Sequence, residues 1–172
     1  MKSRFLLLAI LAFILLPLGL HAGGADSLAA LLVDLPGWSA EKAEGSDASY
    51  GGTRAIAATR SYENGDKRID ATIFFGMQVV SAWGSEYKEG FKVDTPEGII
   101  EVKKIDGFLV YYGYEKGESA GGIMVLLQDP QKKADSGAVL AVEFEGLELE
   151  EALKIARTYD WGKMKAEVAE LN

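Results

Sequence analysis

The stretch that decides the fold runs from residue 53 to residue 75 and reads TRAIAATRSYENGDKRIDATIFF. Two alternating runs flank Asn64-Gly65, and both residues of this pair tolerate a positive φ. The pattern predicts a β-hairpin with a two-residue type I′ turn, one face buried and the other wet. The buried row is Ile56, Ala58, Ile69, Ala71, Ile73 and Phe75, and the other row is Ala57, Thr59, Ser61, Arg68, Asp70 and Thr72.

A second hairpin and a central strand are predicted further along the chain. Residues 99–105 and 108–115 flank Asp106-Gly107, a pair that favours a tight turn between two strands. Residues 121–128 are strongly apolar without alternation, which is typical of a strand buried on both faces. We therefore expect this strand in the centre of the sheet.

The segments around these strands are less regular. Residues 129–137 form a polar loop, after which 138–145 returns as an apolar strand that ends at Gly146. Residues 41–52 are rich in Gly, Ser, Ala and acidic residues and predict a loop or a weak edge strand. Residues 77–88 predict a short helix or an irregular crossover, because Gly84 interrupts the pattern.

Helices are predicted near both ends of the chain. Asp26 occupies an N-cap position, and a leucine stripe follows until Pro36-Gly37 stops it. Residues 147–159 carry a second apolar stripe with acidic residues in the first turn, and 163–171 forms a short helix or a frayed tail. The two stripes are Leu28, Leu31, Leu32 and Leu35, then Leu149, Leu153, Ala156 and Tyr159. The expected class is α+β, a mainly antiparallel curved sheet of hairpins packed against N- and C-terminal helices.

The first 22 residues have the layout of a cleaved export signal. Lys2 and Arg4 precede an apolar run from Phe5 to Leu16, and small residues follow at Ala22-Gly23. The run is shorter than the roughly 20 residues that span a bilayer. We expect residues 1–22 to be a signal peptide and 23–172 to be a single exported domain, periplasmic or secreted and without a stable membrane anchor.

Removal of that segment leaves a chain with neither histidine nor cysteine, since the single histidine is His21 and the chain has no cysteine. This composition excludes Ser-His-Asp and Cys-His nucleophile pairs, zinc sites with thiolate or imidazole ligands, and haem held by either residue. No cofactor is expected. Catalysis is the less favoured class, because only Asp, Glu, Lys and Tyr remain for acid and base chemistry.

The mature chain would be strongly acidic, with 16 basic and 26 acidic residues and a net charge of −10. Such a surface repels phosphate backbones and anionic lipid headgroups. Nucleic acid is therefore excluded as a partner, whereas basic proteins, cationic peptides and divalent cations are permitted. A charge of this size also serves solubility alone.

Carboxylates supply the weaker candidates for chemistry. Glu143 and Glu145 alternate on a strand and project from one face, as a pair of catalytic carboxylates in a glycan hydrolase would. Five glutamates between residues 143 and 151 could hold a hard cation, but the chain lacks a calcium-loop pattern, and we expect no specific metal site. Gly51-Gly52 and Gly121-Gly122 match no phosphate-binding motif and are better explained as turns or strand starts.

Aromatic residues are the most prominent positive feature. Phe108, Tyr112 and Tyr114 share one face of a predicted strand, and Trp83 lies near the end of a predicted element. Exposed aromatic rings stack on sugars, peptides and apolar ligands, although the same pattern also arises from packing under a helix. Tyr112, Tyr114, Phe108 and Trp83 are the predicted ligand-binding residues.

Three functional hypotheses follow, because no motif assigns the chain to a family. The first is an exported, non-catalytic binding or accessory domain whose partner is an unknown protein, peptide or small apolar or sugar ligand. The second is a carboxylate-dependent glycan hydrolase that uses Glu143 and Glu145. The third is an assembly component that pairs through the edge segment 41–52.

Overall fold

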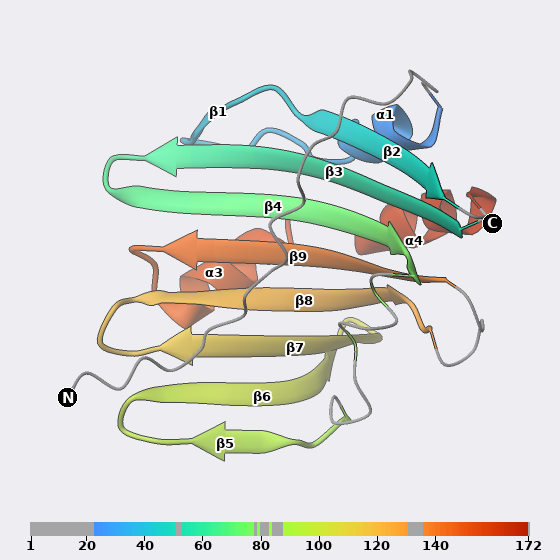
Figure 1. Cartoon of the computed structure of the whole chain (residues 1–172). Helices are drawn as coiled ribbons and strands as arrows, with labels where there is room; N and C mark the ends of the chain where they lie inside the picture. The colour runs from blue at the N-terminus through green and yellow to red at the C-terminus, as the bar shows by residue number, and fades with distance from the viewer. Residues whose placement is uncertain are drawn as a thin grey trace.

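Nine strands form one open antiparallel sheet in the computed structural model, which describes residues 23–50, 53–77, 79, 83, 88–130 and 136–171 (Figure 1). The strands are β1 (Ser39–Ala40), β2 (Glu44–Tyr50), β3 (Thr53–Asn64), β4 (Lys67–Gly76), β5 (Lys92–Asp94), β6 (Gly98–Ile105), β7 (Phe108–Glu115), β8 (Ala120–Gln128) and β9 (Gly137–Glu145). Their order is β1-β3-β4-β9-β8-β7-β6-β5, and β2 pairs with β3 beside β1.

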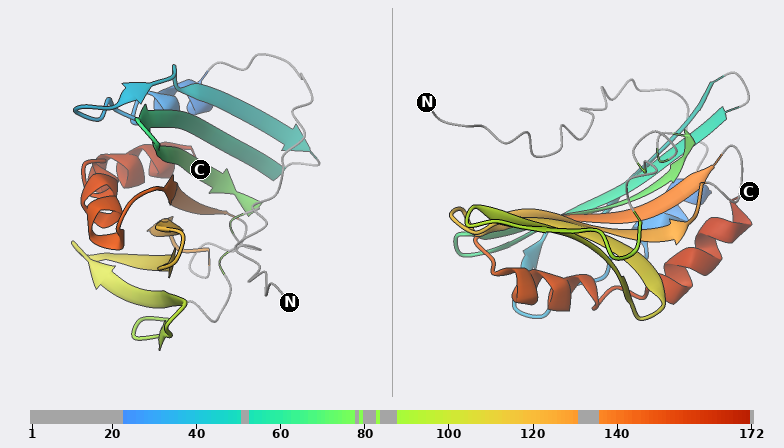
Figure 2. Two further views of the ribbon diagram at one scale, coloured as in Figure 1. Left: turned by 90° about the vertical axis from the view of Figure 1, so that its left-hand side faces the viewer. Right: turned by 90° about the horizontal axis from the view of Figure 1, so that it is seen from below.

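Two meanders meet in the middle of this sheet. Strands β2 to β4 form the first and β5 to β9 the second, and the last strand, β9, pairs antiparallel with β4. The sheet is curved and strongly twisted (Figure 2). The predicted α+β class with a mainly antiparallel sheet is confirmed.

The first hairpin forms with the predicted faces but with a shifted turn. Asn64 pairs with Lys67, so the loop residues are Gly65 and Asp66 rather than Asn64 and Gly65. Only Gly65 has a positive φ, 65°, which fits a type II′ turn with glycine first rather than the predicted type I′ turn. A turn shifted by one residue moves each cross-strand partner by two, so every side chain keeps its face.

The second hairpin and the position of the central strand match their predictions. Asp106 and Gly107 form the two-residue loop between β6 and β7, with φ values of 51° and 85°, as a type I′ turn requires. Strand β8 lies between β9 and β7, in the centre of the sheet as predicted. Its row that faces the helices is buried, but on the other face only Met124 is buried, and Ala120, Gly122 and Leu126 are half-buried, so the predicted burial on both faces is met only in part. The segment 41–52 contributes β2, which pairs only with β3 among the described residues and so lies at an edge, as predicted.

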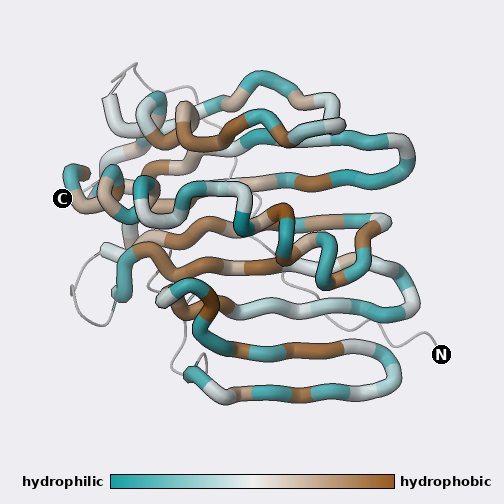
Figure 3. The backbone as a smooth tube through the Cα atoms, turned by 180° about the vertical axis from the view of Figure 1, so that it is seen from behind, coloured by the Kyte–Doolittle hydropathy of each residue, from teal (hydrophilic) through white to brown (hydrophobic). Residues whose placement is uncertain are grey.

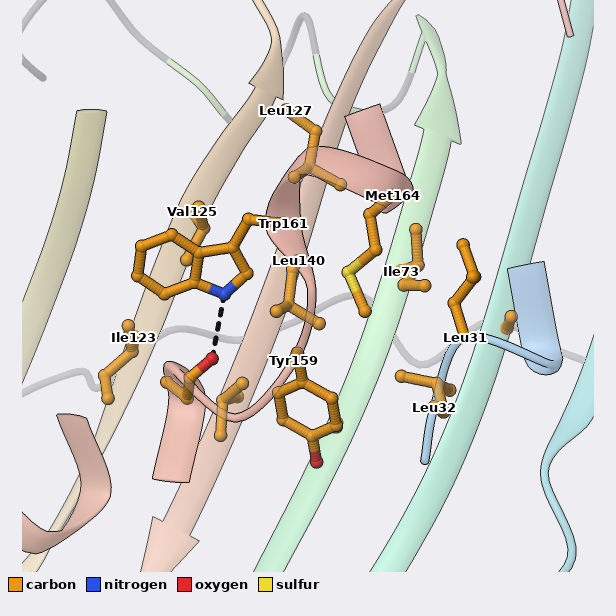
Figure 4. Packing of buried hydrophobic residues seen from close by; sticks show 14 of the residues in the cluster. Leu31, Leu32, Ile73, Ile123, Val125, Leu127, Leu140, Tyr159, Trp161 and Met164 are labelled. Atoms are coloured by element: carbon orange, nitrogen blue, oxygen red, sulfur yellow. Dashed lines mark hydrogen bonds between the residues drawn. The ribbon is translucent and has the colours of Figure 1, made fainter. Parts of the chain in front are cut away.

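Three helices pack on one face of the sheet: α1 (Gly24–Ala29), α3 (Leu149–Ala156) and α4 (Trp161–Glu170). Figure 3 shows this face from behind, with the helices in front of the strands. Their apolar side chains and the inward row of the sheet form one large core. In Figure 4, Tyr159, Trp161 and Met164 lie over Val125, Leu140 and Ile73 of the sheet. The Trp161 indole donates to the Ala156 carbonyl at 2.8 Å.

The helices differ in length from their predictions. Helix α1 begins at Gly24, so Asp26 lies inside it rather than at its N-cap, and the helix ends at Ala29. Leu31 and Leu32 donate to carbonyls three residues earlier, and this tight turn keeps the whole leucine stripe buried as predicted. Helix α3 ends at Ala156, before Tyr159, and residues 161–170 form a true helix rather than a tail.

A smaller apolar cluster lies on the face opposite the helices. Val79 and Trp83 pack there over side chains from β6, β7, β8 and β9 of the second meander. The cluster is Val79, Trp83, Val102, Tyr111, Met124, Val139 and Ala141. Most of the predicted crossover at 77–88 lies outside the described residues.

The predicted signal peptide, residues 1–22, lies outside the described residues. Within the described part of the chain, none of the helices has the length and apolar character needed to cross a bilayer.

Candidate acidic site on the uncovered face

A hollow of about 310 Å³ lies on the face of the sheet opposite α1, α3 and α4, which is turned toward the viewer in Figure 1. It lies over β4, β9 and the first half of β8. We call it the acidic hollow, because its charged lining residues are Asp70, Glu115, Glu118, Glu143, Glu145 and the single cation Arg68.

The strand register brings these residues together from distant parts of the sequence. Arg68 pairs with Glu145, and Asp70 pairs with Glu143, across β4 and β9. Glu143 in turn lies opposite Gly122 of β8. Because directly opposite residues share a face, the carboxylates of two meanders project from one surface.

Arg68, the one cation among the described residues that line the hollow, is engaged by one of its carboxylates. Arg68 Nε donates to Asp70 Oδ2 at 2.8 Å, and Arg68 Nη2 donates to Asp70 Oδ1 at 3.3 Å. Ser61 Oγ also donates to Asp70 Oδ1, at 2.5 Å. These contacts balance the charge of Asp70 and leave the glutamates as the excess negative charge of the hollow.

Two of those glutamates, Glu143 and Glu115, have a raised pKa. Partial burial against the sheet raises the pKa of Glu143, the charges of Asp70 and Glu145 raise it further, and Arg68 opposes the change. Burial is also the main cause of the raised pKa of Glu115, with a contribution from Glu118. The hollow therefore holds more negative charge than its single arginine neutralises.

Glycine forms part of the floor of the hollow. A Cβ built on Gly122 would meet nothing within 4 Å, so the space above this residue is open. Gly121 faces the helices, and a Cβ there would lie 2.2 Å from the Gly113 carbonyl oxygen and 2.9 Å from Phe144. Packing explains Gly121, whereas no described neighbour requires glycine at 122.

The four aromatic residues predicted to bind a ligand lie in two separate cores. Tyr112 and Tyr114 are 3% and 7% exposed under the helices, and Phe108 packs edge-on against Trp161 at 5.6 Å. Trp83 is 5% exposed in the small cluster on the other face. They do not form one exposed site, and a ligand could reach Tyr112 or Tyr114 only by displacing packed side chains.

The hydroxyls of the two tyrosines are also engaged. Tyr112 donates to Glu101, and Tyr114 donates to Glu148 at 2.8 Å while its ring stacks on Phe144. Alternation along β7 directs both rings toward the helices, and these bonds satisfy the hydroxyls at the border of the core.

The predicted carboxylate candidates divide into two groups. Glu143 and Glu145 do share one face, as predicted, and both line the hollow. The other three glutamates of this stretch lie at the start of α3, where Glu148 accepts from Tyr114 and Glu151 pairs with Lys67 at 2.9 Å. Among the described residues, no three acidic side chains are grouped as metal ligands would be.

A second, more open depression lies beside α1 and has a structural explanation. Arg60 lines it and donates to the carbonyl oxygens of Leu32 and Glu41, at 2.7 and 2.9 Å, and it pairs with Asp34. These bonds attach the segment after α1 to β3.

The two glycine pairs singled out in the sequence do not lie together in a described site. Gly51-Gly52 lies outside the described residues, and Gly121-Gly122 lies within β8.

No family model, no curated protein and no solved structure matches this chain. The acidic hollow is therefore interpreted from its own geometry. The sequence placed Arg68 and Asp70 on the polar face of a hairpin without marking them as site residues, and it indicated only a turn or strand start at Gly122. Glu115 and Glu118 were missed. No local signal marks these residues, because only the pairing of β4, β9, β8 and β7 brings them together.

Proposed function

We propose that this protein is an exported, non-catalytic binding domain that receives a cationic group of its partner in the acidic hollow. The observation that carries the proposal is the lining of the hollow, in which the glutamates outnumber the one arginine, itself bound to Asp70. The layout of residues 1–22 supports export, and intact-mass measurement of the protein from its host would test it.

The raised pKa of Glu143 gives the physical reason for a cationic partner. The ionised form of Glu143 is disfavoured, because burial and the charges of Asp70 and Glu145 act against ionisation. A bound ammonium or guanidinium group would relieve this repulsion and lower the pKa. Binding should therefore weaken at acid pH, where Glu143 is protonated, and at high ionic strength.

Titration calorimetry with a short Gly-Lys-Gly peptide, acetylated at its N-terminus and amidated at its C-terminus, tests the proposal, and the same peptide with acetylated lysine is the matched probe without charge. We expect Glu143→Gln combined with Glu145→Gln to weaken lysine-peptide binding by about tenfold, the effect of 1.4 kcal/mol. Glu97→Gln combined with Glu170→Gln is the control for net charge, since both glutamates are exposed and neither lines the hollow. Equal binding of both peptides, or equal losses in both variants, would refute the proposal.

A glycan hydrolase is the second candidate, and one observation favours it. A carboxyl group with a raised pKa suits a general acid, and Glu143 has one beside Glu145. A screen of glycan substrates with Glu143→Gln and Glu145→Gln tests this function. Turnover that disappears in both variants would support it, and equal turnover in parent and variants would exclude these residues.

A further inference from the structure

An exposed apolar patch lies at the β5–β6 edge of the sheet. Phe91, Val93 and Ile100 are 43%, 42% and 38% exposed. Val93 pairs with Ile100, and the Val102 amide donates to the Phe91 carbonyl, so the three residues are cross-strand neighbours. We call them the edge patch. Clustered exposed apolar residues mark interaction surfaces more often than single ones do.

The edge patch shares its face with the acidic hollow. Ile100 lies opposite Gly113, Gly113 lies opposite Gly122, and Gly122 lies opposite Glu143. One row across four strands thus begins at an exposed apolar side chain, crosses two glycines and ends at a carboxylate. The Tyr111 hydroxyl leans over the row, 3.4 Å from where a Cβ of Gly113 would stand.

The spacing of the two ends is set by the sheet itself. Neighbouring strands lie about 4.8 Å apart, so the step from β9 to β6 is about 14 Å and the step to β5 about 19 Å. An extended peptide advances about 3.3 Å per residue. Four to six residues of such a peptide, roughly, would join the hollow to the edge patch.

We infer that this row is the docking surface for an extended peptide that carries a lysine or arginine about four to six residues from a bulky apolar side chain. The inference rests on the proposed function, because the basic residue occupies the acidic hollow. Charge complementarity selects this occupant: a second copy of this chain, with a formal net charge of −8, and an anionic lipid surface would both be repelled.

Four synthetic peptides in a Gly-Ser background test the inference by titration calorimetry. The first has Arg and Phe five residues apart, the second has Arg alone, the third has Phe alone, and the fourth has Arg and Phe adjacent. We expect the first to bind about tenfold more tightly than the second and the fourth, since one well-placed apolar anchor has that effect.

Variants of the edge patch separate this inference from the proposed function. Val93→Thr combined with Ile100→Thr should reduce the affinity of the first peptide to that of Arg alone and leave Arg-alone binding unchanged. Val33→Thr is the matched control, because Val33 is an equally exposed valine, 44%, beside α1. Gly113→Val should weaken only the spaced peptide, because Gly113 lies in the row between the edge patch and the hollow but does not line the hollow.

The outcomes are distinct. Equal affinity of the spaced, adjacent and Arg-alone peptides would overturn the inference while the acidic hollow stands. Absence of binding by every arginine peptide would refute the proposed function as well. Equal effects of the edge-patch variants and Val33→Thr would show that the patch does not contact the peptide, and tighter binding by Phe alone than by Arg alone would contradict the charge argument.

Discussion

At the scale of single residues, two neighbouring glycines in β8 have opposite requirements. Gly121 lies in the row between Tyr114 and Phe144, whose rings stack with centroids 6.2 Å apart, and no room remains for a side chain. Gly122 faces the hollow and has open space above it. Packing therefore requires glycine at position 121, whereas the space above position 122 would accept a side chain.

Gly121→Ala should destabilise the protein by about 1–3 kcal/mol, because its Cβ would overlap the Gly113 carbonyl and force the backbone to shift. Gly122→Ala should be neutral or stabilising by up to about 1 kcal/mol, since alanine loses less backbone entropy on folding. Urea unfolding of both variants measures the difference. Equal destabilisation of the two would contradict the assigned faces.

The Tyr159 hydroxyl presents another residue-scale test. It is buried and makes no hydrogen bond in the described structure, whereas the nearby Tyr62 hydroxyl donates to the Val33 carbonyl at 2.8 Å. Tyr159→Phe should therefore leave the free energy of unfolding unchanged or higher, and Tyr62→Phe should lower it by about 1 kcal/mol. A comparable loss in both, measured by chemical denaturation, would mean that the Tyr159 hydroxyl has a partner.

At the scale of elements, helix α4 is short and depends on its cap and on its buried stripe. Asp160 Oδ1 accepts from the Lys163 amide at 2.8 Å, and Trp161, Met164 and Val168 are buried against the sheet. Helices of this length are marginal without such support. The cap and the docking together decide that residues 161–170 form a helix.

Asp160→Ala should reduce stability by about 1 kcal/mol, because the first-turn amide loses its acceptor. Asp160→Ser keeps a capping oxygen and should retain most of the stability. Thermal unfolding followed by circular dichroism measures both. An unchanged melting temperature in Asp160→Ala would show that docking alone holds the helix.

At the scale of the whole molecule, the sheet face opposite α1, α3 and α4 concentrates negative charge in a chain that is already acidic. Glu143 has a raised pKa in the folded state, so the fold binds its proton more tightly than the unfolded chain does. Protonated Glu143 therefore contributes to the stability of the fold at pH values below the ordinary glutamate pKa. This contribution is lost as the pH rises through the raised pKa of Glu143 in the folded state. Glu143 therefore destabilises the fold near neutral pH, because its ionised form is disfavoured in the acidic hollow.

Glu143→Gln should raise the free energy of unfolding near neutral pH, and with it the melting temperature. The gain should be less than about 1 kcal/mol, since solvent screens this group. The gain should vanish below about pH 4, where the wild-type carboxyl is also neutral in both states. Asp94→Asn is the control of opposite sign, because the hydrogen bond from Lys116 lowers the pKa of Asp94. That variant should lose stability near neutral pH and match wild type in acid.

The sequence predicted much of the fold and little of the candidate site. Alternation between residues 53 and 75 was sufficient for the two faces of the first hairpin, and Asp106-Gly107 for the second turn. The first turn was misplaced by one residue, because Asn64-Gly65 and Gly65-Asp66 are both acceptable locally. Glu143 and Glu145 were singled out, but their neighbours Arg68 and Asp70 are about 75 residues away in the sequence and could not be linked to them.

The sequence by itself determined strands β3, β4, β6, β7, β8 and β9, the existence of α1 and α3, and the two faces of the first hairpin, because periodicity and turn chemistry act within a few residues. It did not predict the short strands β1 and β5. Only the tertiary structure decided that β9 lies between β4 and β8, and that Tyr112 and Tyr114 are buried under the helices. It also decided that carboxylates from separate strands line one hollow on the other face of the sheet. Strand pairing joins residues distant in the sequence, and burial of a shared face selects among the possible partners.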